Sequence, residues 1–326
     1  MKTALITGIT GQDGSYLAEQ LIEKGYEVHG LVRRASTFNT SRLNNLYRST
    51  ELEQKIHIHY IDTVDSLHLY QLIEKISPDE IYNLAALSHV AQSFDQPEYS
   101  AETAGLGLLR ILEIVKATQI KTRIYQASTS ELFGSTPPPQ NEESALVPMS
   151  PYAAAKLYAH EISRIYRDAY GIYISTGILF NHESPRRSRT FVTRKITAAV
   201  AEIVKGKRDY LYLGNLEARR DWGYAPEYTE AMWKMLQLDS PTNLVIATGV
   251  QYSVRDFCSF AFSAAGLNYE KYVKTSPQFE RPLEVESLLG DPTKAREVID
   301  WSPRLLAPEI AQIMVESDLK RDEYLF

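Results

Sequence analysis

Short apolar runs alternate along the chain with longer segments in which apolar side chains recur every three or four positions. The short runs are rich in Ile, Val, Leu and Tyr, as expected of buried strands, whereas the longer segments have the spacing of amphipathic helices. Strands are expected at residues 2–7, 27–32, 56–60, 80–83, 122–127, 174–180 and 243–247. Repeated strand–helix units form a parallel sheet with right-handed crossovers. The pattern therefore predicts an α/β fold with a Rossmann-like, doubly wound parallel sheet.

Three glycines follow the first expected strand, at Gly8, Gly11 and Gly14. In such a loop the first glycine permits a tight turn, the second lets the backbone approach a pyrophosphate, and the third lets the helix lie close to the strand. Because this triplet lies between a strand and a helix that extends to Lys24, we interpret it as a dinucleotide-binding loop. The expected cofactor contacts in the loop are Gly8, Thr10, Gly11, Gln12, Asp13 and Gly14.

The end of the second strand indicates which dinucleotide is preferred. Sites for NAD usually have Asp or Glu there, which binds the ribose hydroxyls. This sequence has Arg33, Arg34 and Ser36 instead. Guanidinium and hydroxyl groups suit a 2′-phosphate, so we expect NADP, although a solvent-exposed basic loop has the same composition.

Further cofactor contacts are expected where the third and fourth strands end. Asp62 is placed either to accept a hydrogen bond from the adenine amino group or to cap the turn before Ser66. The small residues that follow the fourth strand suit a close approach of the backbone, and Ser88 is also a candidate for substrate contact. The expected contacts from this part of the chain are Asp62, Leu84, Ala85, Ala86, Ser88 and Tyr99.

A further helix is expected to begin at Pro151, because Ser150 is a good N-cap and proline suits the first helical position. Tyr152 and Lys156 then lie one turn apart on the same face. An ammonium beside a phenol stabilises the phenolate, which lowers the pKa of the tyrosine and lets it accept a proton near neutral pH. A Tyr-x-x-x-Lys match alone is weak in a chain with 21 tyrosines, so its interpretation depends on neighbouring residues.

Those neighbouring residues follow the fifth strand. Ser128, Thr129, Ser130 and Glu131 are delivered to the carboxyl end of the sheet, near the start of the helix. Their hydroxyl groups are suited to binding one substrate oxygen, and Glu131 adds a second acid or base. The expected catalytic residues are Thr129, Ser130, Glu131, Tyr152 and Lys156.

The second half of the chain has a strongly basic segment. Five basic residues lie within ten positions: Arg186, Arg187, Arg189, Arg194 and Lys195. On a chain of net charge −6 they predict a local positive field suited to phosphate groups. Arginines at residues 219–223 and 280–285 are expected on loops that converge on the same anion. Together these segments indicate a diphosphate-binding surface.

Composition argues against several other functions. The negative net charge is unfavourable for a nucleic-acid surface. No apolar run approaches the roughly 20 residues that span a bilayer, and no signal peptide precedes the first strand, so no membrane contact and a cytoplasmic location are expected. Cys258 is the single cysteine, which excludes an intrachain disulfide. His57 and His59 alternate along one strand without further residues at ligand spacing, so no metal site is expected.

With these motifs, the chain resembles the extended short-chain dehydrogenase/reductases and, within them, the GDP-mannose 4,6-dehydratase family. The matching segments are residues 7–14, 126–131, 150–156, 178–187, 191–196 and 219–223. The first and third segments are shared by the whole superfamily. The Asn-His-Glu-Ser-Pro-Arg and Arg-Asp-Trp-Gly segments, which begin at residues 181 and 220, are more specific to this dehydratase family.

The resemblance implies conversion of GDP-D-mannose to GDP-4-keto-6-deoxy-D-mannose. Tyr152 would take the C4 hydroxyl proton while hydride passes from C4 to NADP⁺. Glu131 would then remove the C5 proton and assist loss of the C6 hydroxyl as water, after which the hydride returns to C6. Lys156 would lower the pKa of Tyr152 and hold the nicotinamide ribose, and Thr129 and Ser130 would orient the C4 oxygen.

The resemblance also implies binding roles for residues in the second half. His182 and Arg187 would contact NADP. The GDP-sugar would be held by Asn181, Lys195, Arg220 and Arg281. Members of the family tend to form tetramers in which the loop with the Arg33–Arg34 pair meets a neighbouring subunit's cofactor site, so a homo-oligomer, tetramer or dimer, is expected.

No repeat, low-complexity tract or linker divides the 326 residues, so two interleaved domains are expected. An NADP-binding Rossmann domain would comprise residues 1–180 and 222–252. A smaller α/β domain that binds the GDP-sugar would comprise residues 181–221 and 253–326.

Two alternatives share the same motifs. Met149 stands where the family usually has Arg, beside the catalytic Tyr152, and related sequences act on GDP-manno-heptose. A nucleotide-sugar epimerase or 4-keto reductase would need Tyr152 and Lys156 but no base for C5. Glu131 therefore separates the dehydratases from the epimerases and reductases.

Overall fold

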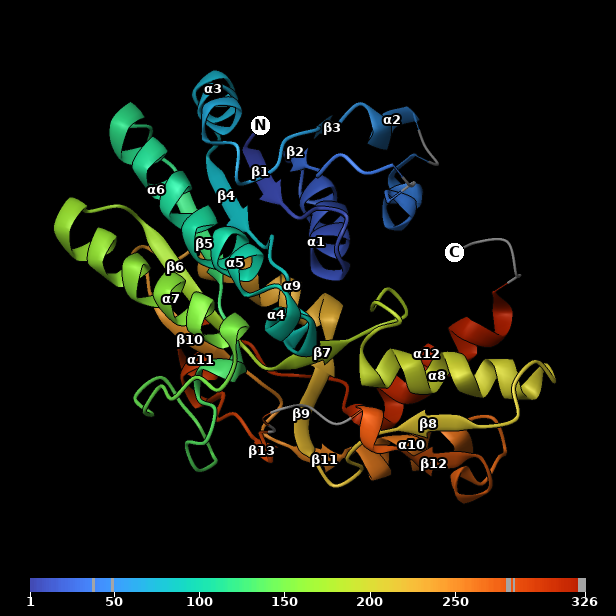
Figure 1. The fold of residues 1–326 in the computed structure, drawn as a ribbon. Helices are drawn as coiled ribbons and strands as arrows, with labels where there is room; N and C mark the ends of the chain where they lie inside the picture. The colour runs from blue at the N-terminus through green and yellow to red at the C-terminus, as the bar shows by residue number, and fades with distance from the viewer. Residues whose placement is uncertain (37–38, 48–49, 280–282, 284, 322–326) are drawn as a thin grey trace.

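The computed structural model describes residues 1–36, 39–47, 50–279, 283 and 285–321. Its main sheet has seven parallel strands in the order β10-β6-β5-β4-β1-β2-β3 (Figure 1). The strands are β1 Thr3–Thr7, β2 Glu27–Leu31, β3 Ile56–His59, β4 Glu80–Asn83, β5 Arg123–Ala127, β6 Ile174–Leu179 and β10 Asn243–Ile246. Each begins and ends within one residue of its predicted bounds. The order reverses at β1, so the predicted doubly wound sheet is confirmed.

Alternate residues of each strand face one of two helical layers. Leu5, Ile81 and Ile124 pack against α3, α6 and α7. Ala4 and Ile6 face the opposite side and pack against α1, α9 and α11. The bounds of these helices are α1 Gln12–Glu23, α3 Ser66–Ile76, α6 Gly107–Thr118, α7 Pro151–Tyr170, α9 Ala225–Met235 and α11 Thr293–Ile299.

The long helix expected over residues 97–118 is helical throughout but not uniform. It begins as α5 Pro97–Ser100, continues as a π-helical segment Ala101–Leu106, and becomes α6 at Gly107. A Cβ atom at Gly105 would lie 3.3 Å from the Ala155 carbonyl oxygen on α7. Close packing of two helices therefore accounts for this glycine. Two shorter helices, α2 Thr50–Glu53 and α4 Val90–Asp95, were not predicted.

The second lobe has its own apolar core, to which Ile196, Phe257 and Met314 contribute. Its helices are α8 Val192–Val204, α10 Val254–Ser263 and α12 Ala307–Lys320, and its parallel strand pair is β8 Leu211–Leu213 with β12 Val273–Thr275. Residues of α11, by contrast, join the core of the first lobe through Ala295 and Ile299. The division of the chain into two domains stays a prediction.

A small second sheet lies between the lobes (Figure 1). Its central strand, β9 Arg219–Tyr224, pairs with β7 Asn181–Glu183, β11 Gln251–Ser253 and β13 Ser287–Leu288. The prediction of a loop at residues 219–223 was therefore wrong. Each partner strand has only two or three residues and comes from a distant segment. The pairing therefore cannot be predicted from local hydrophobic periodicity.

Within the described part of the chain, no helix combines the length and the apolar character that crossing a bilayer requires.

Candidate active site

A cavity of about 1060 Å³ lies where the carboxyl ends of the main strands face the second lobe. Most of the predicted site residues line it. These are Gly8, Thr10, Gly11, Gln12, Asp13, Gly14, Arg33, Asp62, Leu84, Ala85, Ala86, Ser88, Tyr99, Thr129, Ser130, Glu131, Tyr152, Lys156, Asn181, His182, Arg187, Lys195 and Arg220. Arg34 and Ser36 do not line the cavity, and Arg281 falls outside the described residues.

The glycine loop has the geometry predicted for it. Gly8 has φ +72°, and a Cβ at Gly14 would lie 2.4 Å from the Gly8 carbonyl oxygen. The first glycine thus permits the turn and the third allows α1 to pack against it. Gly11 is the N-cap of α1, and no side chain caps this helix end. An uncapped helix N-terminus at a cavity wall suits the negative charge of a diphosphate.

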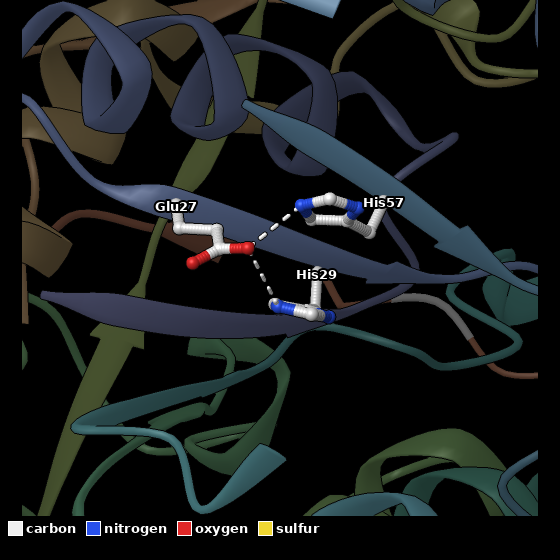
Figure 2. Close-up of side chains that lie close together, drawn as sticks. All are labelled: Glu27, His29 and His57. Atoms are coloured by element: carbon white, nitrogen blue, oxygen red, sulfur yellow. Dashed lines mark ion pairs between the residues drawn. The ribbon is translucent and has the colours of Figure 1, made fainter. Parts of the chain in front are cut away.

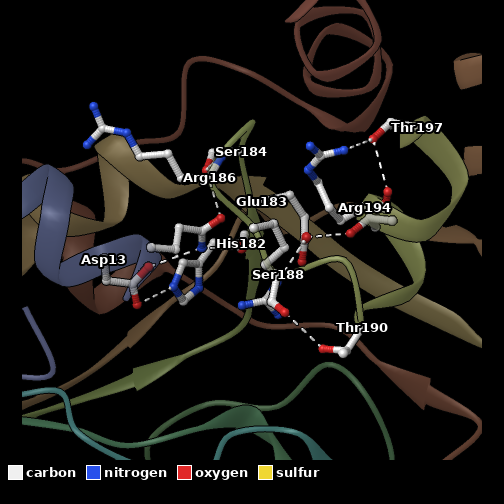
Figure 3. Close-up of polar contacts among 12 residues, drawn as sticks. Asp13, His182, Glu183, Ser184, Arg186, Ser188, Thr190, Arg194 and Thr197 are labelled. Carbon is white, nitrogen blue, oxygen red and sulfur yellow. Dashed lines mark hydrogen bonds and ion pairs between the residues drawn. The ribbon is translucent and has the colours of Figure 1, made fainter. Parts of the chain in front are cut away.

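The loop is fastened to β7 by an ion pair between Asp13 and His182 (Figure 3). His182 Nε2 lies 2.9 Å from Asp13 Oδ2, and Nδ1 lies 2.7 Å from the Phe180 carbonyl oxygen. Burial opposes both charges, but their attraction and hydrogen bond prevail, so the pKa of His182 is raised and that of Asp13 is lowered. Both ring nitrogens face acceptors, so the imidazolium form of His182 would donate two hydrogen bonds.

Gln12 adds a second connection to the same strand. Its Nε2 donates to the His182 carbonyl oxygen (3.0 Å), and its Oε1 accepts from Ser184 Oγ (2.7 Å). The Asn-His-Glu-Ser segment therefore fixes the position of the glycine loop. Sequence reasoning identified this segment by resemblance but missed the reason for it, because the two partners are 172 positions apart.

The residues predicted to be catalytic come from two elements that meet at the cavity. Ser150 caps α7 as predicted, and its Oγ accepts from Ala153 N at 3.1 Å. Lys156 Nζ donates to the Ala127 carbonyl oxygen at the end of β5 (2.8 Å) and lies 5.9 Å from the centroid of the Tyr152 ring. After β5, Thr129 Oγ1 accepts from the backbone N–H of Glu131 (3.3 Å), which shapes the turn that carries the carboxylate.

Burial is the main cause of the pKa shifts of Tyr152 and Lys156, which lie side by side in the cavity wall. Burial raises the pKa of Tyr152 above its ordinary value, although a hydrogen bond with Thr129 lowers it. Burial also lowers the pKa of Lys156 to about 8. The prediction that Lys156 lowers the pKa of Tyr152 is therefore wrong for the protein alone, because the ammonium is directed at the Ala127 carbonyl and lies beside the phenol ring.

The predicted basic surface is largely paired with carboxylates. Arg186 pairs with Glu19, Arg187 with Glu183, Arg189 with Glu202 and Arg194 with Asp318. Arg194 is almost fully buried, so its assignment to a phosphate-binding field was wrong. Lys195 does line the cavity, where its Nζ lies 3.7 Å from the centroid of the Phe279 ring.

Two buried polar atoms in the cavity wall, Ser128 Oγ and Asn181 Oδ1, have no hydrogen-bond partner among the described residues. A buried polar group without a partner costs about 1–3 kcal/mol, so such atoms are uncommon in folded proteins. A ligand rich in hydroxyl groups would satisfy both. The wall therefore fits a sugar beside the catalytic residues.

The residues that the sequence predicts to set cofactor specificity lie at the edge formed by β2 and β3. Arg33 lines the cavity and its Nη1 donates to the Tyr99 hydroxyl (2.7 Å). Asp62 also lines the cavity, and its Oδ1 accepts from Val64 N at 3.3 Å. The sequence left open whether Asp62 faces the cofactor or caps the following turn. In the structure it does line the cavity, and it also accepts the hydrogen bond within the turn.

Several residues that line the cavity were not predicted, among them Glu183, Arg208 and Phe279. Glu183 is buried, accepts a hydrogen bond from Thr193 and pairs with Arg187 at 3.2 Å, and burial raises its pKa. Arg208 and Phe279 line the cavity from the second lobe. The basic run that ends at Arg208 is the only signal in the sequence, and Phe279 belongs to no motif.

Comparisons with known proteins agree on one family. The family model described as GDP-mannose 4,6 dehydratase matches residues 5–314. The chain is 49% identical to a GDP-mannose 4,6-dehydratase of Yersinia enterocolitica, over 98% of this chain and 95% of that protein. It is also 49% identical to GDP-mannose 4,6 dehydratase 1 of Arabidopsis thaliana, over 99% of this chain and 92% of that protein.

Solved structures share the fold at lower identity. A dTDP-glucose 4,6-dehydratase from Streptomyces venezuelae superposes with a TM-score of 0.86 at 21% identity, over 97% of this chain and 96% of that chain. A UDP-glucose 4-epimerase from Thermotoga maritima superposes with a TM-score of 0.84 at 23% identity, over 97% and 98%.

Proposed function

Because this chain belongs to the GDP-mannose 4,6 dehydratase family, we propose that it converts GDP-D-mannose to GDP-4-keto-6-deoxy-D-mannose with NADP as its cofactor. The observation that carries the proposal is the meeting of Glu131, Tyr152 and Lys156 in one cavity wall. Lys195 and Arg220 of the second lobe line the same cavity and supply positive charge for the diphosphate.

A bound nicotinamide supplies reversible hydride transfer, first from C4 of the sugar and finally to C6. Tyr152 acts as the phenolate, which Thr129 stabilises by hydrogen bonding, and accepts the C4 hydroxyl proton at its Oη. The C4 ketone makes the C5 proton acidic, and Glu131 removes it. Glu131 then protonates the departing C6 hydroxyl, so that one water leaves. The proton held by Tyr152 passes to C5 when C6 receives the hydride, so the tyrosine and the cofactor both end as they began.

The remaining polar groups of the wall position the sugar. Ser128 Oγ and Asn181 Oδ1, which lack protein partners, are suited to the sugar hydroxyls. Ser130 lies beside Glu131 and supplies a further hydroxyl near the C4 oxygen. The Asp13–His182 ion pair holds the glycine loop in a fixed position relative to β7, which carries Asn181.

The experiment that tests the reaction uses Glu131→Gln with GDP-mannose deuterated at C4 and NADP⁺. Wild-type protein is expected to lose water from the sugar, carry deuterium from C4 to C6 and accumulate no NADPH. The variant should still oxidise C4 but dehydrate roughly 10²-fold more slowly or worse, because the C5 base is missing. Glu143→Gln, at an exposed carboxylate of the following loop, serves as the control.

Two results would contradict the proposal. Full dehydration by Glu131→Gln would remove the role given to this carboxylate. Inversion at C4 without loss of water by the wild-type protein would indicate an epimerase.

The preference for NADP rests on Arg33, which lines the cavity beside Tyr99, with Arg34 next to it in the chain. The dTDP-glucose dehydratase from Streptomyces venezuelae is described with NAD bound, so the preference is a specific expectation for this chain.

We expect Arg33→Gln to reduce the ratio of NADP to NAD affinity about tenfold. A tenfold change corresponds to about 1.4 kcal/mol, which is roughly the contribution of one charged hydrogen bond. Equilibrium binding of both dinucleotides measures it, with Arg34→Gln as a comparison. Tighter binding of NAD by the wild-type protein would overturn it.

A further inference from the structure

Four ionisable side chains gather at the outer edge of the main sheet, away from the residues that line the cavity. Glu27 and His29 alternate on β2, and His57 and His59 alternate on the edge strand β3. The strand register places His29 beside His57. Residues in register on parallel neighbours point to the same face, so all four side chains share one face of the sheet.

Three of these side chains direct a ligand atom at one point (Figure 2). Glu27 Oε1 lies 2.8 Å from His57 Nε2 and 3.8 Å from His29 Nε2, and the three atoms lie within 4.8 Å of one another. In a tetrahedral zinc site, bonds of about 2.0–2.2 Å put neighbouring ligand atoms roughly 3.3 Å apart. One observed ligand–ligand distance is shorter than this value and the other is longer, so small side-chain rotations would bring the three atoms to tetrahedral spacing.

The orientation of the rings favours a shared cation over a hydrogen-bonded pair. His57 Nε2 is buried and makes no hydrogen bond with any described residue, although the carboxylate oxygen is only 2.8 Å away. A ring nitrogen this close to an oxygen, but not aligned with it, is the arrangement of two ligands that face a third atom. His29 Nε2 lies 3.8 Å from the same oxygen, which is beyond hydrogen-bonding distance.

Metal binding needs the tautomer in which His29 donates from Nδ1, and His59 offers an acceptor for that hydrogen bond. His29 Nδ1 lies 2.9 Å from His59 Nε2. When Nδ1 donates to His59, the Nε2 atom of His29 is left as a lone pair directed toward Glu27.

We propose that Glu27, His29 and His57 bind a divalent transition-metal ion of the zinc class, with His59 as the hydrogen-bond partner that orients His29. Two imidazoles and one carboxylate are a borderline donor set, which suits Zn²⁺ better than Mg²⁺ or Ca²⁺, and water completes the coordination. The side chain of Glu27 is 34% exposed and that of His57 is 41% exposed, so the ion has direct access from solvent. Spacing along one strand could not reveal this site, because its ligands come from two strands.

The ion would act as a cross-link between β2 and β3. β3 is the last strand of the sheet and has a neighbour on one side only. Its chain continues directly to Ile61 and Asp62, which line the cavity. Metal binding would therefore stabilise the edge of the sheet next to the cofactor end of the cavity.

The test is a zinc titration of the full-length, tag-free protein after treatment with a chelator, followed by isothermal calorimetry. We expect one Zn²⁺ per chain with a dissociation constant in the micromolar range or below. His57→Asn and Glu27→Gln should each weaken binding at least tenfold. His68→Asn is the matched control, because His68 pairs with Asp65 at 2.6 Å on an exposed helix surface and belongs to no such three-residue group among the described residues.

Thermal unfolding gives a second measurement that does not depend on the enzyme's reaction. Zinc should raise the Tm of the wild-type protein and of His68→Asn, and a chelator should reverse the shift, whereas His57→Asn should show none. A silent titration of the wild-type protein, or equal affinity in wild-type and His57→Asn proteins, would overturn the proposal and leave the cluster as a histidine–carboxylate contact alone.

Discussion

The catalytic wall, residues 128–156, and the basic segment, residues 181–195, face the same cavity but are held in place differently. The wall is built mainly from near contacts: Ser150 caps its own helix, and Lys156 reaches the end of the neighbouring strand. The basic segment is held by partners that are distant in sequence. Asp13 pairs with His182 across 169 positions, and Arg194 pairs with Asp318 across 124.

This difference separates two kinds of charged residue. In the wall, the buried Ser128 Oγ lines the cavity without a hydrogen-bond partner among the described residues, so this polar group is available to a ligand. In the basic segment, most guanidinium groups are occupied by carboxylates, and they position the backbone more than they bind anions. A cluster of arginines in a sequence therefore indicates ligand binding only after its internal partners are known.

The largest effect is expected in the wall. Tyr152→Phe removes the hydroxyl that exchanges a proton with the C4 oxygen, so kcat should fall about 10²- to 10⁴-fold. The ring stays in place, so the free energy of unfolding should change little. Steady-state kinetics and urea denaturation measure the two quantities. Tyr158→Phe, on the exposed side of the same helix, should leave kcat unchanged, and a similar loss in both variants would contradict the assignment.

The next effect is on stability, in the basic segment. Arg194→Met leaves Asp318 buried without its partner, which should lower the free energy of unfolding by about 3–5 kcal/mol. Arg189→Met breaks an exposed pair with Glu202 in the same segment and should cost no more than about 1 kcal/mol. Urea denaturation of both variants makes the comparison. Equal decreases in the free energy of unfolding would show that the contribution of an arginine to stability does not depend on its burial here.

The smallest effect is expected where the two regions are joined. The raised pKa of His182 stabilises the fold below pH 6.5, and this contribution is lost as pH rises through the folded-state value. The lowered pKa of Asp13 stabilises the fold above pH 3.8, and this contribution is lost as pH falls through the folded-state value. Between these limits the pair should contribute about 1.5–3 kcal/mol, as hydrogen bonds between charged groups do.

A double-mutant cycle with His182→Asn and Asp13→Asn measures this coupling across the pH range. The coupling energy should be largest in mildly acidic solution and decline at both extremes. A coupling that does not vary with pH would show that the contact is not ionic.

The sequence predicted those parts of the molecule that depend on local pattern. Each main strand was placed within one residue, because buried strands are short apolar runs, and the start of α7 followed from Ser150 and Pro151. The strand β9 and the burial of Arg194 were not predictable, since both depend on partners from distant segments. The pKa of Tyr152 was predicted in the wrong direction because burial cannot be read from helical spacing.

The shared strand β9 limits how the two lobes can move. Its backbone is hydrogen-bonded to β7, which follows β6 of the main sheet almost directly, and to β11, which leads directly into α10 of the second lobe. A hinge rotation that opened the cavity would have to break these ladder bonds. Entry and release of a nucleotide sugar should therefore depend on movements of the loops at the cavity rim. The two lobes should keep their relative orientation throughout the reaction.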